Sequence, residues 1–83
     1  MTMDAPLDPE VVHDLVSYAE IARVVELLPI LVREKRRRDG LSLRAAADQI
    51  GVVGSTVMRF EYGGGIAWET VPALLRWVGE VTP

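Results

Sequence analysis

Residues 41–64, LSLRAAADQIGVVGSTVMRFEYGG, constrain the fold of this chain of 83 residues more than any other segment. Two short helical patterns are separated there by only four residues, Gly51-Val52-Val53-Gly54. Alanine is the strongest helix former, and glycine adopts the left-handed conformation that commonly ends a helix. Two short helices joined by a turn of three or four residues that contains glycine predict a helix-turn-helix.

The apolar residues of this pair predict which faces pack together. The side chains expected to point inward or to close the corner are Ala46, Ala47, Ile50, Val52, Val57 and Phe60. The residues expected on the opposite face of the second helix are Gly54, Ser55, Met58 and Arg59. A short helix with such a face can enter the major groove of DNA, with its N-terminal residues nearest the base edges.

Three further helices are predicted around this pair. Asp8-Pro9-Glu10 combines a capping side chain, a proline for the first turn and an acid near the positive end of the helix dipole. A helix is therefore predicted over residues 9–28, and Pro29 ends it or begins the next one over residues 30–38. The last helix opens at Thr70-Val71-Pro72 and runs through Val78, with Gly79 just past its end.

The predicted fold class is all-α, because no segment alternates with period two for long enough to form a strand. Residues 1–8 are expected to be a flexible N-terminus. Residues 9–83 are expected to form a single helical domain, in which an N-terminal helix (9–28) precedes a helix-turn-helix core (29–79).

The 9–28 helix has an unusual pattern, because its polar residues recur every three positions. They are Asp14, Ser17, Glu20, Arg23 and Glu26. At about 100° per residue this line winds around the helix, so the apolar side chains point in different directions along its length. Such a helix must contact neighbours on more than one side, or be broken near its middle.

Charge is distributed unevenly along the chain, whose net charge is −3. Residues 1–28 hold six acids and one arginine, whereas residues 29–83 hold eight bases and six acids. Six of these bases cluster within twelve positions, and they are Arg33, Lys35, Arg36, Arg37, Arg38 and Arg44. The asymmetry favours a local anion-binding surface beside an acidic segment, and the alternative is a solvated basic face.

Residues 30–79 resemble the Cro/CI-repressor type of helix-turn-helix protein, also called the XRE family. The segments that carry the resemblance are REKRRRDGLSL, AAADQIGV, STVMRFEYG and VPALLRWVG. The resemblance implies a five-helix lambda-repressor-like domain. The chain departs from that pattern by an extra N-terminal helix and by lacking the usual fifth helix after Gly79. Val53 also stands where relatives have a Ser or Thr cap, and Ala46 stands where they have a larger apolar residue.

The resemblance implies a role for each matching residue. Arg36 and Glu61 match an ion pair that ties the first helix of the family domain to the end of the recognition helix; otherwise they are two surface charges. Base reading is implied for Gly54, Ser55, Met58 and Arg59, since arginine suits the O6/N7 edge of guanine; the alternative for Arg59 is a solvated side chain. The residues expected at DNA phosphates are Arg38, Ser42, Arg44, Thr56, Tyr62, Gly63 and Gly64, with the two glycines using backbone N–H groups and Ser42 having helix capping as its other role.

The N-terminal helix is expected to take the place of the missing fifth helix. There it would cover Trp77 and the space left by Ala46, and its other apolar side would contact a second copy. The residues expected in this homodimer contact are Val11, Leu15, Tyr18, Val25 and Leu28. The alternative is a helix wholly absorbed in its own core.

Several function classes are disfavoured by the composition. The chain has no cysteine and one histidine, which cannot build a zinc site, and no catalytic or phosphate-loop motif is present. No enzyme activity, cofactor, metal or small-molecule substrate is therefore expected.

The acidic N-terminus and the short apolar runs argue against a signal peptide or a membrane span, so a cytoplasmic protein of a bacterium or a phage-infected host is expected. The expected function is a sequence-specific regulator that binds double-stranded DNA; the alternative is a protein-interaction module of this fold, such as an antitoxin or antirepressor.

Overall fold

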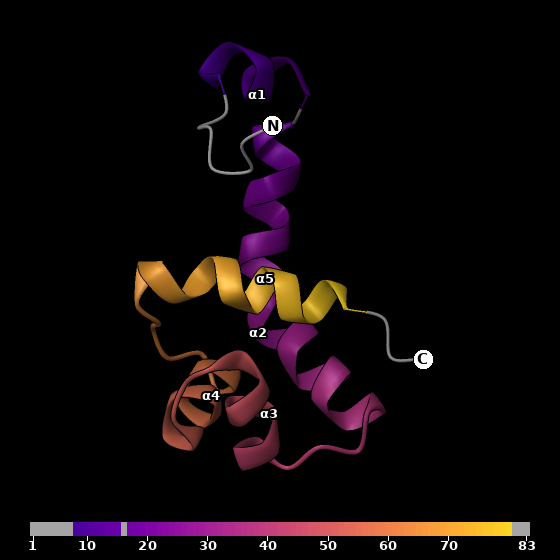
Figure 1. Ribbon diagram of the computed structural model, residues 1–83, viewed down its shortest axis with the longest axis vertical. Coiled ribbons are helices and arrows are strands. Elements are labelled where there is room, and N and C mark those ends of the chain that lie inside the picture. The colour runs from indigo at the N-terminus through magenta and orange to yellow at the C-terminus, as the bar shows by residue number, and fades with distance from the viewer. Residues whose placement is uncertain (1–7, 16, 81–83) are drawn as a thin grey trace, which may run out of the picture.

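The computed structural model describes residues 8–15 and 17–80, apart from the side chains of Asp14 and Leu15. The described residues form five α-helices and one 3-10 turn and contain no strand, which confirms the all-α class (Figure 1). The elements are α1 (Pro9–Leu15), α2 (Tyr18–Arg38), α3 (Leu43–Ile50), α4 (Gly54–Glu61), η1 (Trp68–Thr70) and α5 (Val71–Gly79). None of the described helices is both long and apolar enough to cross a membrane.

The predicted N-terminal helix is broken near its middle, and its second half continues through Pro29. Asp8 caps α1 as predicted, since its carboxylate accepts the N–H of Glu10 at 2.9 Å. Ser17 then caps α2, with its Oγ accepting the N–H of Glu20 at 3.3 Å. The boundary predicted at Pro29 is therefore wrong. The Ser-x-x-Glu spacing of a capping box at residues 17–20 was the sequence signal for the true start.

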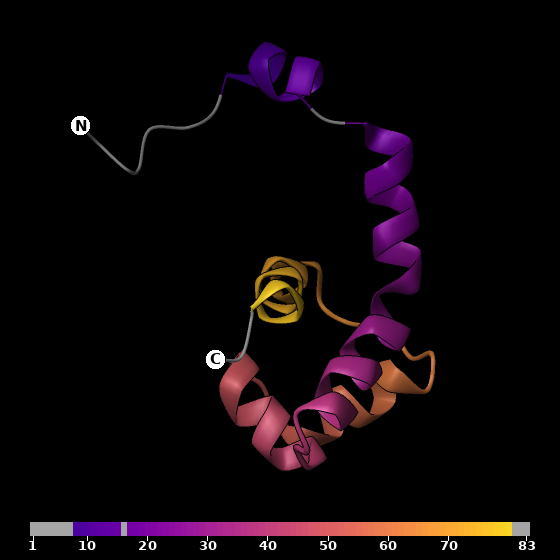
Figure 2. The ribbon, with the colours of Figure 1, turned by 90° about the vertical axis from the view of Figure 1, so that its right-hand side faces the viewer.

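A proline inside α2 removes one backbone hydrogen bond and crowds the preceding turn, which commonly bends a helix. Both ribbon views show α2 changing direction partway along its length (Figures 1 and 2). The helix remains continuous because residues on both sides of Pro29 are buried: Leu28 and Val32 are part of the hydrophobic core. Tertiary burial therefore outweighs the local preference of proline for a helix end.

Residues 18–27 of α2, here called the arm, extend away from the helices that form the core, and α1 lies beyond them (Figure 2). The ring centroids of His13 and Tyr18 lie 5.5 Å apart, at the place where α1 meets the arm. The prediction that the N-terminal helix fills the place of a fifth helix is wrong, because α1 and the arm extend away from the core, whereas Trp77 contacts Lys35 and Gln49, which lie outside residues 9–28. Val11 and Tyr18 are exposed as predicted, Val25 is half-buried, and the side chain of Leu15 lies outside the described part. Leu28 is 1% exposed within the core, so it is not available to a partner.

The hydrophobic core lies between the C-terminal half of α2 and helices α3, α4 and α5. Its buried members are Leu28, Val32, Ala46, Ala47, Val57, Phe60, Val71, Leu74 and Trp77. Ala46, Ala47, Val57 and Phe60 point inward as predicted, and Ile50 and Val52 pack against the core. The predicted helix-turn-helix is therefore formed by α3 and α4. Gly51 has a φ of 95°, and the N–H groups of Gly51 and Val52 both donate to the carbonyl of Ala47, which ends α3.

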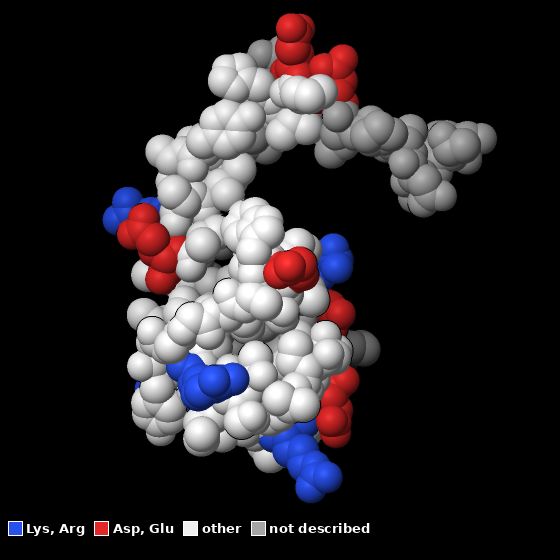
Figure 3. Space-filling view, turned by 90° about the vertical axis from the view of Figure 1, so that its left-hand side faces the viewer, with Lys and Arg blue, Asp and Glu red and all other residues white. Residues whose placement is uncertain are grey.

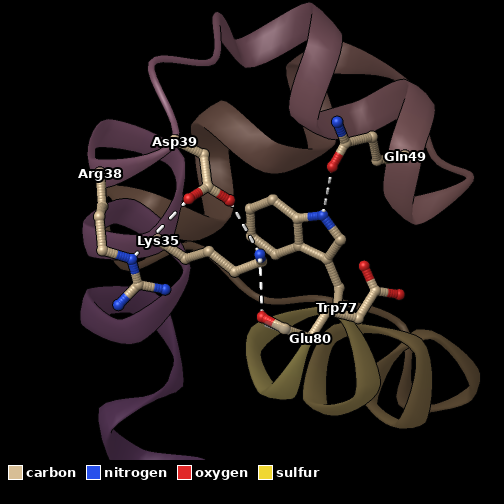
Figure 4. Close-up of polar contacts among 6 residues, drawn as sticks. All are labelled: Lys35, Arg38, Asp39, Gln49, Trp77 and Glu80. Carbon is tan, nitrogen blue, oxygen red and sulfur yellow. Dashed lines mark hydrogen bonds and ion pairs between the residues drawn. The ribbon is translucent and has the colours of Figure 1, made fainter. Parts of the chain in front are cut away.

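A buried lysine fixes the C-terminal end of α5 against α2 (Figure 4). Lys35 is 3% exposed, and its Nζ donates to Asp39 Oδ2 at 2.9 Å and to the carbonyl oxygen of Glu80 at 3.3 Å. The same ammonium lies 5.0 Å from the ring centroid of Trp77, a distance typical of a cation–π contact. The indole N–H of Trp77 donates to Gln49 Oε1 of α3 at 2.9 Å. Trp77 is therefore held by α2 and α3.

The Lys35–Asp39 pair gives a prediction for stability. Replacing Asp39 by Asn leaves a buried ammonium without its counter-charge, and the free energy of unfolding should fall by about 3 kcal/mol. Replacing Lys35 by Met removes the buried ammonium and leaves the carboxylate of Asp39, which is 13% exposed and lies 3.8 Å from Arg38 Nε, so the loss should be smaller, about 1–2 kcal/mol. Urea denaturation measures both variants. Equal losses, or a larger loss for Lys35→Met, would contradict a need to neutralise the buried ammonium.

Candidate nucleic-acid interface

The outer face of α4 carries most of the residues predicted to read bases. Ser55, Met58 and Arg59 are all exposed, and Ser55 and Arg59 are one helical turn apart on the same side. Gly54 differs from the prediction because it is half-buried. A Cβ on Gly54 would lie 3.8 Å from the Cα of Arg44, so this glycine faces α3 at the start of α4. The side chains that remain available to read bases are therefore those of Ser55, Met58 and Arg59.

The N-terminal end of α4 lies beside the exposed Arg44 at the start of α3. Val53 supplies no capping side chain, as predicted, and it is itself exposed. Within the described part of the chain no hydrogen bond to the N–H of Gly54 or Ser55 is formed, whereas Thr56 N–H donates to the carbonyl of Val53. The N–H groups at the N-terminus of α4 and the exposed arginine on the neighbouring helix supply the hydrogen-bond donors and the positive charge that suit an oxyanion.

The predicted pair of Arg36 and Glu61 is present and joins the end of α2 to the end of α4. Arg36 Nε donates to Glu61 Oε2 at 2.7 Å, and Nη2 donates to Glu61 Oε1 at 2.9 Å. The carboxylate is 4% exposed, so this bidentate pair is largely removed from water. Arg36 Nη1 also donates to the carbonyl of Leu41 in the turn before α3. The hydrogen bonding of Arg36 to the carboxylate of Glu61 raises the pKa of Arg36, and burial partly opposes that rise.

The basic cluster of residues 33–44 is only partly available to a partner. Lys35 and Arg36 are paired with Asp39 and Glu61, and Arg38 Nε lies 3.8 Å from Asp39 Oδ1. Within residues 8–15 and 17–80, the exposed arginines without an ion pair are Arg23, Arg37, Arg44, Arg59 and Arg76. Figure 3 accordingly shows separate basic side chains over the core helices, with uncharged surface and acidic side chains between them.

Gly63 and Gly64 do not have the free N–H groups predicted for phosphate binding. The N–H of Gly63 donates to the carbonyl of Phe60 at 3.1 Å, and that of Gly64 donates to the carbonyl of Arg59 at 2.7 Å. Gly63 has a φ of 92°, so the two residues form a Schellman motif that ends α4. These glycines are required by backbone geometry, because a Cβ on Gly64 would lie 2.8 Å from the carbonyl oxygen of Arg59.

The other predicted phosphate contacts differ in how freely they could reach a ligand. Ser42 Oγ accepts the N–H of Ala45 at 3.0 Å, so this serine caps α3. Arg38 is exposed beside Asp39, and Thr56 is half-buried. Tyr62 is 81% exposed. Trp68 of η1, which the sequence did not single out, is 76% exposed, and its position in a glycine-rich loop outside any apolar periodicity was the available signal.

Comparison of the chain with protein-family models, curated proteins and solved structures gives no match. The described part of the chain also brings together no group of three histidine, aspartate or glutamate side chains that could hold a metal ion.

The Arg36–Glu61 pair can be tested for its energetic coupling. Arg36→Met should strand the carboxylate of Glu61, Glu61→Gln should strand the guanidinium, and the double variant removes both charges. A double-mutant cycle measured by urea denaturation should therefore give a coupling free energy of about 2 kcal/mol. If the two losses add without coupling, the side chains do not pair in solution.

A second stability prediction compares two adjacent glycines. Gly64→Ala should lower the free energy of unfolding by about 1–3 kcal/mol, since the new Cβ collides with the backbone of Arg59. Gly65→Ala is the matched control, because nothing lies within 4 Å of its Cβ position. That variant should be neutral or more stable by up to about 1 kcal/mol, because alanine restricts the unfolded chain. Thermal or urea denaturation gives both values, and equal effects would exclude the close contact at Gly64.

Proposed function

We propose that the protein is a sequence-specific regulator that binds double-stranded DNA through α4. The observation that carries this proposal is the exposed outer face of α4, where Ser55 and Arg59 point away from the core beside Arg44. In this proposal α4 enters the major groove, Arg59 donates to a guanine edge and Arg44 contacts the phosphate backbone.

The pairing of charges supports these roles. Arg44 and Arg59 are exposed and have no carboxylate partner among the described residues, whereas Lys35 and Arg36 are neutralised by acids of the same chain. The Arg36–Glu61 pair holds the C-terminal end of α4, and the Schellman motif at Gly63 stops the helix immediately afterwards. A short helix fixed at its C-terminal end presents its outer face in a defined orientation, as base reading requires.

The resemblance of residues 30–79 to the Cro/CI-repressor type adds to this proposal. It suggests a small repressor of the phage Cro, excision-regulator or bacterial kind, in which two copies bind adjacent half-sites. Such a protein needs no cofactor, and its surroundings would be the cytoplasm.

The second candidate is a protein-interaction module of the antitoxin or antirepressor kind. The observation that favours it is the limited positive surface: the net charge is −3, and the basic side chains in Figure 3 are separated rather than gathered in one patch. The exposed apolar side chains of the arm also favour a protein partner. Binding of duplex DNA at low and at physiological salt distinguishes the two candidates, because phosphate contacts release counterions and give a steep salt dependence.

The proposal predicts different outcomes for two arginines. After selection of a preferred duplex, Arg59→Ala should weaken its binding by about 1–3 kcal/mol and relax the preference at one base pair. Arg44→Ala should weaken preferred and random duplexes by similar factors, and it should make the salt dependence shallower. Fluorescence anisotropy with both duplexes at two salt concentrations measures these effects.

Arg23→Ala is the matched control, because it removes the same charge from the arm, away from α4. It should change DNA affinity little. A loss equal to that of Arg59→Ala would mean that only net charge matters, and no binding of the unaltered protein to any duplex at low salt would eliminate the DNA proposal.

A further inference from the structure

We propose that the arm is a self-association surface, on which a second copy of this chain packs in the opposite orientation. The surface is the inner face of the arm, defined as Tyr18, Ile21, Val24 and Val25. The proposal does not rest on DNA binding, since its contacts and its test involve the protein alone.

The inner face continues the side of α2 that is buried in the core. At 100° per residue, its four side chains lie within an arc of about 120° centred on the direction of Leu28 and Val32. In the C-terminal half of α2 this side packs in the core, beneath α5 and α4. In the arm the same side is covered only in part: the ring of His13 lies against Tyr18 and Val25 is half-buried, while Tyr18, Ile21 and Val24 remain 41–54% exposed.

The molecule is hollowed beside the arm. Figure 3 shows a recess between α1, the arm and the top of the core helices, and the acidic and basic side chains near it lie at its margins. The charged residues of the arm, Glu20, Arg23 and Glu26, fall outside the arc of the inner face. A partner can therefore cover the inner face without burying an unpaired charge, whose desolvation would oppose binding.

Charge complementarity identifies the partner as a second copy and sets its orientation. Residues 8–26 carry five acids and one arginine, whereas residues 29–80 carry eight bases and six acids. Two arms in opposite directions bring the α1 end of each copy, where residues 8–26 have a net charge of −4 (one minus five), towards the core helices of the other, where residues 29–80 have a net charge of +2 (eight minus six). Two arms in the same direction would place both acidic ends together, which like-charge repulsion disfavours. A two-fold contact of opposed arms is the symmetric arrangement that satisfies this pattern.

The exposed area indicates that this dimer is weak. Covering the inner face removes on the order of 300 Å² of apolar surface per copy. Stable interfaces bury about 800 Å² per partner, so the arms alone are expected to exchange rapidly. The expected dissociation constant of the dimer is therefore micromolar, a range that sedimentation can measure.

Continuity of α2 gives the contact a structural consequence. The same 21-residue helix carries the inner face near one end and Arg36, which holds α4, near the other. At about 1.5 Å per residue the helix is roughly 30 Å long. A contact between two arms consequently fixes the positions of both copies of α4 relative to each other.

Two exposed side chains of the arm provide a matched test. Ile21 and Leu27 are 42% and 43% exposed, but Ile21 lies within the arc of the inner face, whereas Leu27 lies about 120° around the helix from Ile21 and outside that arc. Sedimentation equilibrium of the full chain from about 10 to 500 μM should show its mass rising from 9.2 kDa towards twice that value. Ile21→Glu should weaken association at least about tenfold, whereas Leu27→Glu should leave it within about twofold.

A monomer at every concentration would overturn the proposal, as would an equal weakening by both variants. Circular dichroism shows whether each variant keeps its helices. If Ile21→Glu loses its fold, the amide chemical shifts of the unaltered protein are measured during dilution instead. Shift changes centred on the inner face support the contact. Shift changes elsewhere, or no changes, overturn it. Association that strengthens as salt is raised would overturn the opposed orientation of the arms.

Discussion

The ion pair of Arg36 and Glu61 is the interaction on which the geometry of the helix-turn-helix depends. One guanidinium contacts both oxygens of a carboxylate that is 4% exposed, and it also binds the carbonyl of Leu41. The pair therefore joins α2, the turn before α3 and the end of α4 at one point. Because a buried carboxylate is costly without a partner, α4 cannot move away from α2 without losing this compensation.

Helix α2 connects the hydrophobic core, the end of α5 and the arm to the Arg36–Glu61 pair. Its C-terminal half contributes Leu28 and Val32 to the core, and its buried Lys35 holds the end of α5 beside Trp77. Its N-terminal half leaves the core and carries an apolar face that is only partly covered by the described residues. A single helix thus links the proposed self-association surface to the proposed DNA-reading helix, and Pro29 lies where its two halves meet.

The candidate interface could be predicted from the sequence wherever local spacing decides the outcome. Ser55 and Arg59 are one turn apart, so a helix that buries Val57 and Phe60 must expose them. The roles assigned to Gly63 and Gly64 were wrong, because the hydrogen bonds that end α4 use their N–H groups. The basic cluster was also overestimated, since one-dimensional spacing does not reveal that Asp39 and Glu61 lie against Lys35 and Arg36.

The sequence by itself determined the helical class, the helix-turn-helix and the caps at Asp8, Ser42 and Gly51, because these depend on periodicity and on hydrogen bonds between near neighbours. Only the tertiary structure decided that α2 runs through Pro29 and that Leu28 is buried while Ile21 is exposed. Both outcomes depend on where α5 crosses α2. That crossing is set by packing among residues distant in the chain, in which burial of Leu28 and Val32 outweighs the local cost of proline.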